Sequence, residues 1–257
     1  MKKTVILLFA ATLIIACKNE KNIPLPSASF HFGNQTSEDF KLVANDTTSL
    51  ISAVKGAASI SWDFGDGRTS KDDRPVLSYS KAGVYTIMLT ATSEDGKKTT
   101  PSKKITVLDL VLKNIVIDKV YWNNTDEQFA QAGWPLTNSA DLYIKIQRLQ
   151  GDDVFSGGFA PNATMIYTSP LQKNIYKTSD VPIIINLKSK VVLEKDVLLA
   201  RNYLISLIAK SNTGEYVLFT NRYSGSNQLV KTDNLTKNDF EVTSSFFSSL
   251  NLKFNFE

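Results

Sequence analysis

The stretch Ser61-Trp62-Asp63-Phe64-Gly65-Asp66-Gly67 decides the fold of the N-terminal part of the chain. Ile60, Trp62 and Phe64 alternate with polar residues, which is the period of a strand with one buried face. The two glycines accept positive φ, and the short carboxylate of Asp66 can cap its own turn. We therefore expect a strand that ends in a tight turn and folds back as a hairpin.

A second segment that fits the same fold follows at residues 79–92. Gly83 supplies a turn, and residues 84–92 then alternate apolar and polar side chains as a long strand does. Together the two segments resemble the hallmark of PKD-type immunoglobulin-like domains, a WDFGDG turn followed by a Y…G-x-Y segment. The resemblance extends over residues 24–108 and implies an N-terminal β-sandwich.

Residues 25–108 are predicted to form this first domain, because short alternating runs there are separated by clusters of turn-forming residues. The side chains expected to face its core include Trp62, Phe64, Tyr85, Ile87, Leu89 and Ala91. Its strands are expected at residues 30–32, 40–44, 49–54, 58–64, 76–80, 84–92 and 103–108.

Residues 109–257 are predicted to form a second domain. No glycine or proline separates residue 108 from the β-branched run at residues 110–120, so the linker is short and the domains should sit end to end. No long segment keeps a helical period, although residues 125–132 fit one or two helical turns. The predicted fold class is all-β, with two tandem antiparallel β-sandwiches of which the first is PKD/immunoglobulin-like. Further strands are expected at residues 141–149, 164–168, 182–187, 190–193, 202–210, 215–222 and 250–256.

Residues 1–16 combine a positive start with an apolar run that is too short for a membrane span but suits a signal-peptide core. Cys17 follows directly, and as the only cysteine it excludes an internal disulfide. The sequence Ile14-Ile15-Ala16-Cys17 resembles the lipobox of bacterial lipoproteins, which implies cleavage before Cys17 and a lipid on its thiol. The alternatives are an ordinary secretory leader with an incidental cysteine and a short buried segment.

Residues 17–24 are interpreted as a polar tether between this lipid and the first domain. Lys18 and Glu20 loosely resemble the surface-export signal of Bacteroidota lipoproteins. Several acyl chains together make a stable membrane anchor. We therefore expect an outer-membrane lipoprotein of the cell envelope, on the surface or the periplasmic face.

Length, composition and charge limit the class of protein and the partners that we expect. The chain has 257 residues, enough for two domains of ordinary size, and 42% hydrophobic with 21% charged residues is typical of globular proteins. The formal net charge is +4 without any basic run, so nucleic acid is not an expected partner.

Two groups of residues invite a metal site, but none is predicted. Asp63 and Asp66 lack EF-hand spacing, and short carboxylates in such turns usually bond to the turn backbone. Residues 139–146 resemble the SDPYVKV strand of the calcium- and lipid-binding sandwich domains of protein kinase C and synaptotagmin. However, Leu142 replaces the proline, and the loop at residues 211–215 has no aspartate, whereas calcium needs about six to eight oxygen ligands.

Tyr121, Trp122 and Trp134 are the candidate ligand-binding residues. They flank an irregular stretch between predicted strands, and aromatic faces in loops of a rigid sandwich can stack on sugar rings. The alternative is that they plug one end of the sandwich or the seam between the domains, since large aromatics are mostly buried.

The motifs of common enzyme classes are missing. The sequence has no phosphate-binding GxxxxGK[ST], no dinucleotide-binding GxGxxG, no HExxH and no GxSxG. His31 is the only histidine, which excludes a His-rich zinc site and a Ser-His-Asp triad on any other histidine. We expect neither catalysis nor a cofactor.

The predicted function is that of a lipid-anchored envelope protein without catalytic activity. Its PKD-type domain would act as a spacer, and its second sandwich would contact a protein or polysaccharide partner. The alternative is a surface glycan-binding lipoprotein of a polysaccharide-uptake system, with Trp122 and Trp134 as the sugar platform.

Overall fold

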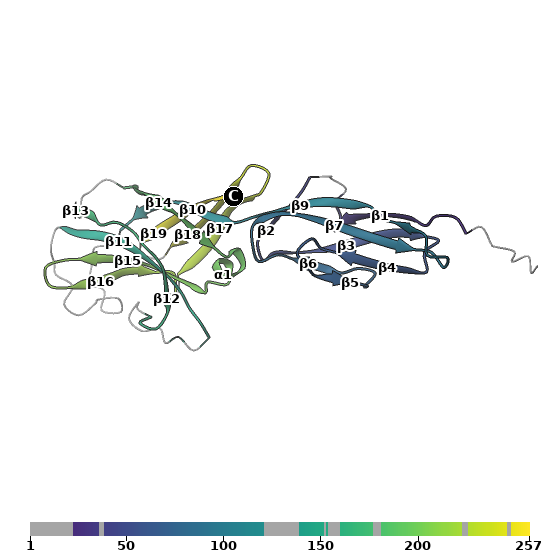
Figure 1. The fold of residues 1–257 in the computed structure, drawn as a ribbon. Coiled ribbons are helices and arrows are strands. Elements are labelled where there is room, and N and C mark those ends of the chain that lie inside the picture. The colour runs from purple at the N-terminus through teal and green to yellow at the C-terminus, as the bar shows by residue number, and fades with distance from the viewer. Residues whose placement is uncertain are drawn as a thin grey trace, which may run out of the picture.

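The computed structural model describes residues 23–35, 39–120, 139–151, 153, 160–176, 181–222, 226–245 and 248–257. Within these ranges nearly every element is a β-strand, and the strands form two sandwiches that lie end to end (Figure 1). The predicted all-β fold with tandem sandwiches is confirmed. No helix in the described part of the chain is both long and apolar enough to cross a membrane.

The first sandwich packs a three-stranded sheet against a larger one. Among the described strands every pair in it is antiparallel except β2 with β9, which run parallel at one edge. The smaller sheet has the order β1 (Ser27–Phe32), β3 (Thr47–Lys55) and β6 (Val76–Ser78). The larger has the order β2 (Phe40–Val43), β9 (Ser102–Leu108), β7 (Gly83–Thr92), β4 (Ser59–Asp63) and β5 (Thr69–Ser70), and β8 (Lys98–Thr99) also pairs with β7.

Aromatic side chains fill the core between these two sheets. Phe30 of β1 meets Trp62 of β4 edge to face, with ring centroids 5.2 Å apart. Ile87 and Leu89 of β7 are fully buried in the same core, as their alternation predicts. Tyr85 is only half-buried, because it lies near the start of β7 where the core opens.

The second sandwich is built from two five-stranded antiparallel sheets and one short helix, α1 (Lys195–Leu199). One sheet has the order β14 (Ile183–Leu193), β10 (Leu110–Lys119), β19 (Ser249–Phe256), β18 (Asp239–Ser245) and β17 (Asn227–Asn234). The other has the order β12 (Thr164–Thr168), β11 (Ser139–Arg148), β15 (Tyr203–Lys210) and β16 (Glu215–Thr220), and β13 (Gln172–Tyr176) also pairs with β11.

Several elements of the second sandwich differ from expectation. The runs predicted at 182–187 and 190–193 are one strand, β14, which bulges at residues 187–190 opposite Lys113. The strands β13, β17 and β18 and the helix α1 are absent from the sequence prediction. In β17 a register shift after Val230 breaks the alternation that would mark a strand. The turns expected at residues 125–132 lie outside the described residues.

The seam between the sandwiches is short and well connected. Asp109 alone separates β9 from β10. Val43 at the end of β2 is buried in the core of the second sandwich. Asp109 exchanges two backbone hydrogen bonds with Glu257 of the second sandwich, at 2.6 and 2.9 Å. Lys195 at the start of α1 pairs with Asp233 of β17 at 2.8 Å and approaches Asp46 of the first sandwich at 3.9 Å. These contacts hold the two sandwiches in one relative orientation.

The chain enters the first sandwich at the end opposite the seam (Figure 1). β7 begins beside the seam, where Gly83 pairs with Val107, and its other end pairs with β8. At that other end the Lys97 ammonium donates to the Ile23 carbonyl, and Thr99 Oγ1 donates to the Pro26 carbonyl at 2.6 Å. The entry point and the second sandwich are therefore separated by the full length of the first sandwich.

The second sandwich has its own far end, which we call the distal end. The Tyr203 hydroxyl accepts a hydrogen bond from the Glu194 N–H at 3.1 Å, next to Lys195 at the seam. β15 runs from Tyr203 away from the seam and ends at Lys210. The turn from β15 to β16 thus lies at the distal end (Figure 1).

Candidate functional site

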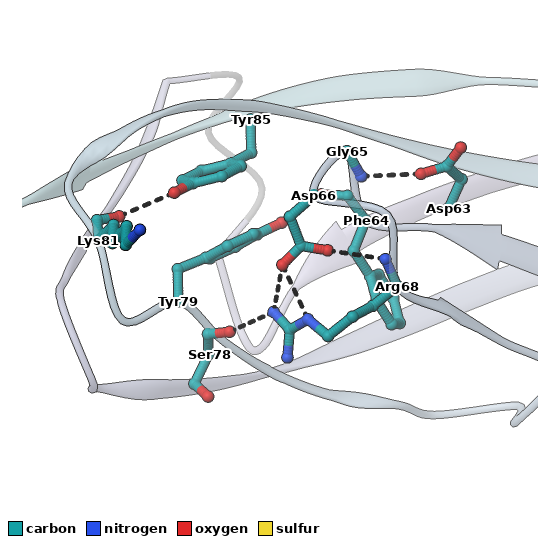
Figure 2. Close-up of polar contacts among 9 residues, drawn as sticks. All are labelled: Asp63, Phe64, Gly65, Asp66, Arg68, Ser78, Tyr79, Lys81 and Tyr85. Carbon is teal, nitrogen blue, oxygen red and sulfur yellow. Dashed lines mark hydrogen bonds and ion pairs between the residues drawn. The ribbon is translucent and has the colours of Figure 1, made fainter.

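The glycine turn that follows β4 is closed by its own carboxylates (Figure 2). Asp63 Oδ1 accepts the Gly65 N–H at 2.8 Å, and Asp66 Oδ1 accepts the Arg68 N–H at 3.0 Å. Arg68 also donates its Nε–H to Asp66 Oδ2 at 2.8 Å. The prediction that both aspartates bond within the turn is confirmed. Among the described residues no group of three or more His, Cys, Asp or Glu side chains is arranged to hold a metal ion.

Two tyrosines pack beside this turn (Figure 2). The rings of Tyr79 and Tyr85 stack with centroids 3.9 Å apart and an interplanar angle of 18°. The Tyr79 hydroxyl donates to the Phe64 carbonyl at 2.6 Å, and the Tyr85 hydroxyl donates to the Lys81 carbonyl at 2.9 Å. The Arg68 guanidinium lies 5.4 Å from the Tyr79 ring centroid, which adds a cation–π contact.

The charges of this cluster stabilise one another. Burial alone would raise the pKa of Asp66, but the hydrogen bonds from the Arg68 side chain and backbone outweigh it and hold that pKa below its ordinary value. Burial raises the pKa of Tyr79, with the Asp66 charge adding to the rise, so the tyrosine remains a hydrogen-bond donor. The cluster is thus fixed as carboxylate, guanidinium and neutral phenol.

A hollow of about 390 Å³ lies over this cluster, with Asn45 and Ser80 among its lining residues. Its tyrosines present little free ring surface, because the Tyr85 ring lies between Tyr79 and the backbone of Gly83. Its charged groups are bonded to one another as described above. We interpret the cluster as structural: it ties the starts and ends of strands together at the seam end of the first sandwich.

A second hollow, of about 310 Å³, lies on the outer face of the second sandwich toward the distal end. We call it the distal hollow. Three antiparallel strands, β11, β15 and β16, bring its walls together, since Lys210 pairs in register with both Asp141 and Glu215. Its lining residues are Tyr143, Lys145, Thr168, Ser169, Leu171, Lys210 and Glu215.

Tyr143, which lines the distal hollow, belongs to a small apolar cluster with Ile208 and Val217 that is separate from the main core. These residues alternate with the core-facing residues of their strands, so they point to the outer face of the sheet. Tyr143 is nevertheless only 5% exposed. The distal hollow thus combines a buried aromatic side chain with charged walls.

The charged walls of the distal hollow are coupled. Lys145 Nζ lies 3.5 Å from Glu215 Oε2 and 5.3 Å from the centroid of the Tyr143 ring. The hydrogen bond from Tyr143, together with the ammonium groups of Lys145 and Lys210, holds the pKa of Glu215 below its ordinary value despite partial burial. Burial, with the bond to Glu215, raises the pKa of Tyr143. Glu215 is therefore an ionised acceptor and Tyr143 a protonated donor.

The residues singled out from the sequence are placed as follows. Cys17 and the aromatic candidates Tyr121, Trp122 and Trp134 lie outside the described residues, so their roles remain predictions. The His31 Nδ1 lies 2.7 Å from the Gly33 carbonyl, within hydrogen-bonding distance of a turn backbone atom.

The distal hollow was not predicted from the sequence. Two of its charged residues nevertheless belong to segments whose sequences were compared with those of calcium- and lipid-binding sandwich domains. Lys145 belongs to the strand at residues 139–146 that resembles SDPYVKV, and Glu215 closes the loop at residues 211–215. The structure brings these two segments together. The alternation of Tyr143 and Lys145 with core residues could have marked an outward face, but only the sheet register pairs that face with Glu215.

The first sandwich has a match among known protein families. A family model described as PKD domain matches residues 25–107, so this sandwich is a PKD-type immunoglobulin-like domain. The pre-pro-metalloprotease PrtV of Vibrio cholerae is 46% identical over 46 residues, which are 18% of this chain and 5% of PrtV. Collagenase ColA of Clostridium perfringens is 44% identical over 48 residues, which are 19% of this chain and 4% of the collagenase.

The solved PKD1 domain of the Vibrio cholerae metalloprotease PrtV is also similar. It is 28% identical, and the match covers 33% of this chain and 98% of that domain with a TM-score of 0.27. The matched stretches span only about one twentieth of the two curated relatives, so the relatives' activities do not describe this chain.

Proposed function

We propose that this chain is a lipid-anchored protein of the bacterial cell envelope. Its PKD-type domain acts as a rigid spacer, and its second sandwich binds a partner without catalysing a reaction. The lipid would be carried by Cys17, at the end of the predicted leader.

One observation carries this proposal: the chain enters the first sandwich at the end opposite the second sandwich. A lipid attached before Ile23 would therefore leave the second sandwich as the part farthest from the membrane. β7 and β10 each have ten residues and run in opposite directions from the seam. At about 3.3 Å per residue they place the two far ends roughly 65 Å apart.

The seam supports the spacer role because it restricts bending. A flexible linker would let the second sandwich fold back to the membrane. Here Val43 is buried in the second core, and Asp109 between the sandwiches exchanges two backbone hydrogen bonds with Glu257 of the second sandwich. Binding at the distal end of such a rod would take place away from the lipid surface.

The experiment that tests the proposal measures height above a membrane. Cys17 is the only cysteine and would be blocked by its lipid, so one introduced cysteine gives a unique label. Exposed positions at the entry end, near the seam and at the distal end are available as Lys55→Cys, Lys81→Cys and Asn212→Cys. Energy transfer to acceptor dyes in the bilayer should fall in that order.

Two results would contradict the proposal. Equal energy transfer from Lys55→Cys and Asn212→Cys would mean that the molecule lies flat, and the spacer role would be wrong. Membrane association that persists in Cys17→Ser would show that the cysteine is not the anchor. A chain labelled at Lys55→Cys in the Cys17→Ser background is the matched control, and its transfer signal should disappear.

A further inference from the structure

We propose that the distal hollow binds a neutral, hydroxyl-rich ligand, namely one sugar residue of a glycan. The inference rests on the proposed function for its setting, because that function puts the distal end where a partner is met. The site itself is argued from its own residues, which are distinct from Tyr121, Trp122 and Trp134.

Charge balance indicates that the ligand is neutral. Lys145, Lys210 and Glu215 line the hollow. Asp141 does not line it, but it lies opposite Lys210 in the sheet register and adds a second negative charge beside the site, which balances the two lysines. Asp141 is itself held, because its Oδ1 accepts the Asn174 N–H at 2.9 Å. A charged ligand would leave one of these groups uncompensated in a partly desolvated site, at a cost that a neutral ligand avoids.

The positions of donors and acceptor suit vicinal hydroxyl groups. Lys145 Nζ donates to Glu215 Oε2 at 3.5 Å, a long hydrogen bond that leaves the ammonium further donors and the carboxylate further acceptor sites for a ligand. A sugar hydroxyl accepts from an ammonium group while it or its neighbour donates to a carboxylate, so one diol can satisfy both atoms. Thr168 adds an exposed hydroxyl, which donates to the Met165 sulfur at 3.5 Å.

The remaining wall is apolar, as the C–H face of a sugar ring requires. Leu171 is 39% exposed at the rim of the hollow. The volume of about 310 Å³ lies at the lower limit of ligand pockets, which suits one or two rings and not a large ligand. The Tyr143 ring is covered by the Lys145 ammonium and provides no stacking face. We therefore expect weak binding, with a dissociation constant on the order of 1 mM.

The test is a titration of the full chain in detergent, followed by NMR or calorimetry. The probes are neutral saccharides (glucose, galactose, mannose, xylose and their β-linked disaccharides), the anionic glucuronate and the cationic glucosamine. At least one neutral sugar should bind more tightly than both charged ones. Glu215→Gln should weaken that binding about tenfold, because it replaces a charged acceptor by a neutral one.

A matched control lies on the other sheet of the same sandwich. Lys253 and Glu241 are also a cross-strand lysine–glutamate pair, on β19 and β18, and neither lines a described hollow. Glu241→Gln should leave sugar binding unchanged. Thermal unfolding of both variants shows that each is folded, and Lys210→Met supplies a second loss of binding that does not depend on Glu215.

Several outcomes would overturn the inference. They are no neutral-sugar binding at tens of millimolar, tighter binding of glucuronate or glucosamine, and equal loss in Glu215→Gln and Glu241→Gln. Binding that survives Glu215→Gln but is lost in Trp122→Ala with Trp134→Ala would assign the site to the aromatic stretch instead. The proposed function fails separately, through the membrane-height measurement, which the Glu215→Gln variant should not change.

Discussion

The two glycines of the turn after β4 differ in what they contribute to the first sandwich. Gly65 has φ +75° and lies so close to β7 that a Cβ there would sit 2.5 Å from the Thr86 carbonyl oxygen. Gly67 has φ +91°, but a Cβ there would meet nothing within 4 Å. The two glycines therefore share a conformational requirement, and only Gly65 adds a steric one.

This difference gives a paired prediction. Gly67→Ala should lower the free energy of unfolding by about 1–2 kcal/mol, the cost of a side chain at positive φ. Gly65→Ala should lower it by about 1–3 kcal/mol more, because β4 and β7 must also move apart. Urea unfolding followed by tryptophan fluorescence measures both, in a Trp122→Phe, Trp134→Phe background that leaves Trp62 as the only tryptophan. Equal losses in the two variants would show that the close approach to Thr86 has no energetic consequence.

At the scale of elements, alternation predicted the strands that have one buried face. Residues 164–168 were predicted with the bounds that β12 has, and the run predicted at residues 250–256 is β19 with one residue added. β17 was missed because it is an edge strand in which the consecutive apolar residues Leu229 and Val230 are both exposed, so its sequence does not alternate. The distal hollow could not be predicted, because its charges lie on strands far apart in sequence that only sheet register brings together.

The contact between α1 and the first sandwich is an element-scale feature with a pH signature. Burial raises the pKa of Asp46, Asp233 and Asp196 add to the rise, and Lys195 opposes it. A carboxyl whose folded-state pKa lies above its unfolded value binds protons more readily when folded. Ionised Asp46 therefore costs stability at neutral pH, and this cost disappears as pH falls below the ordinary value of 3.8.

We predict that Asp46→Asn raises the free energy of unfolding at pH 7 and that the gain vanishes below about pH 3.8, where Asp46 is protonated in both states. Lys195→Met should lower it by about 1–3 kcal/mol at pH 7, since Asp46, Asp196 and Asp233 then lose their shared counter-charge. Denaturant unfolding between pH 3 and pH 7 measures both. If Asp46→Asn destabilises the protein as much as Lys195→Met does, the attraction of Asp46 to Lys195 outweighs the cost of its burial, and this assignment is wrong.

At the scale of the whole molecule, the two sandwiches act as one body only if the seam holds them. The sequence indicated a short linker, but it could not show that neighbouring residues of β2 serve different cores. Leu42 is buried in the core of the first sandwich, whereas Val43 is buried in the core of the second. Because side chains alternate along a strand, one turns back into its own domain and the next points across the seam.

This alternation yields a prediction about shape. Val43→Ala removes apolar contact across the seam, about 2 kcal/mol by the methyl groups lost, and should let the two sandwiches move relative to one another. Leu42→Ala removes contact within the first sandwich and should lower its stability without letting the two sandwiches move relative to one another.

Spin labels at Lys55→Cys and Asn212→Cys in a Cys17→Ser background report the distance between the two far ends. The distance distribution should be narrow in the parent chain and in Leu42→Ala, and broad in Val43→Ala. A narrow distribution in Val43→Ala would contradict this, and would mean that the Asp109–Glu257 backbone bonds and the Lys195–Asp46 pair hold the two sandwiches without Val43.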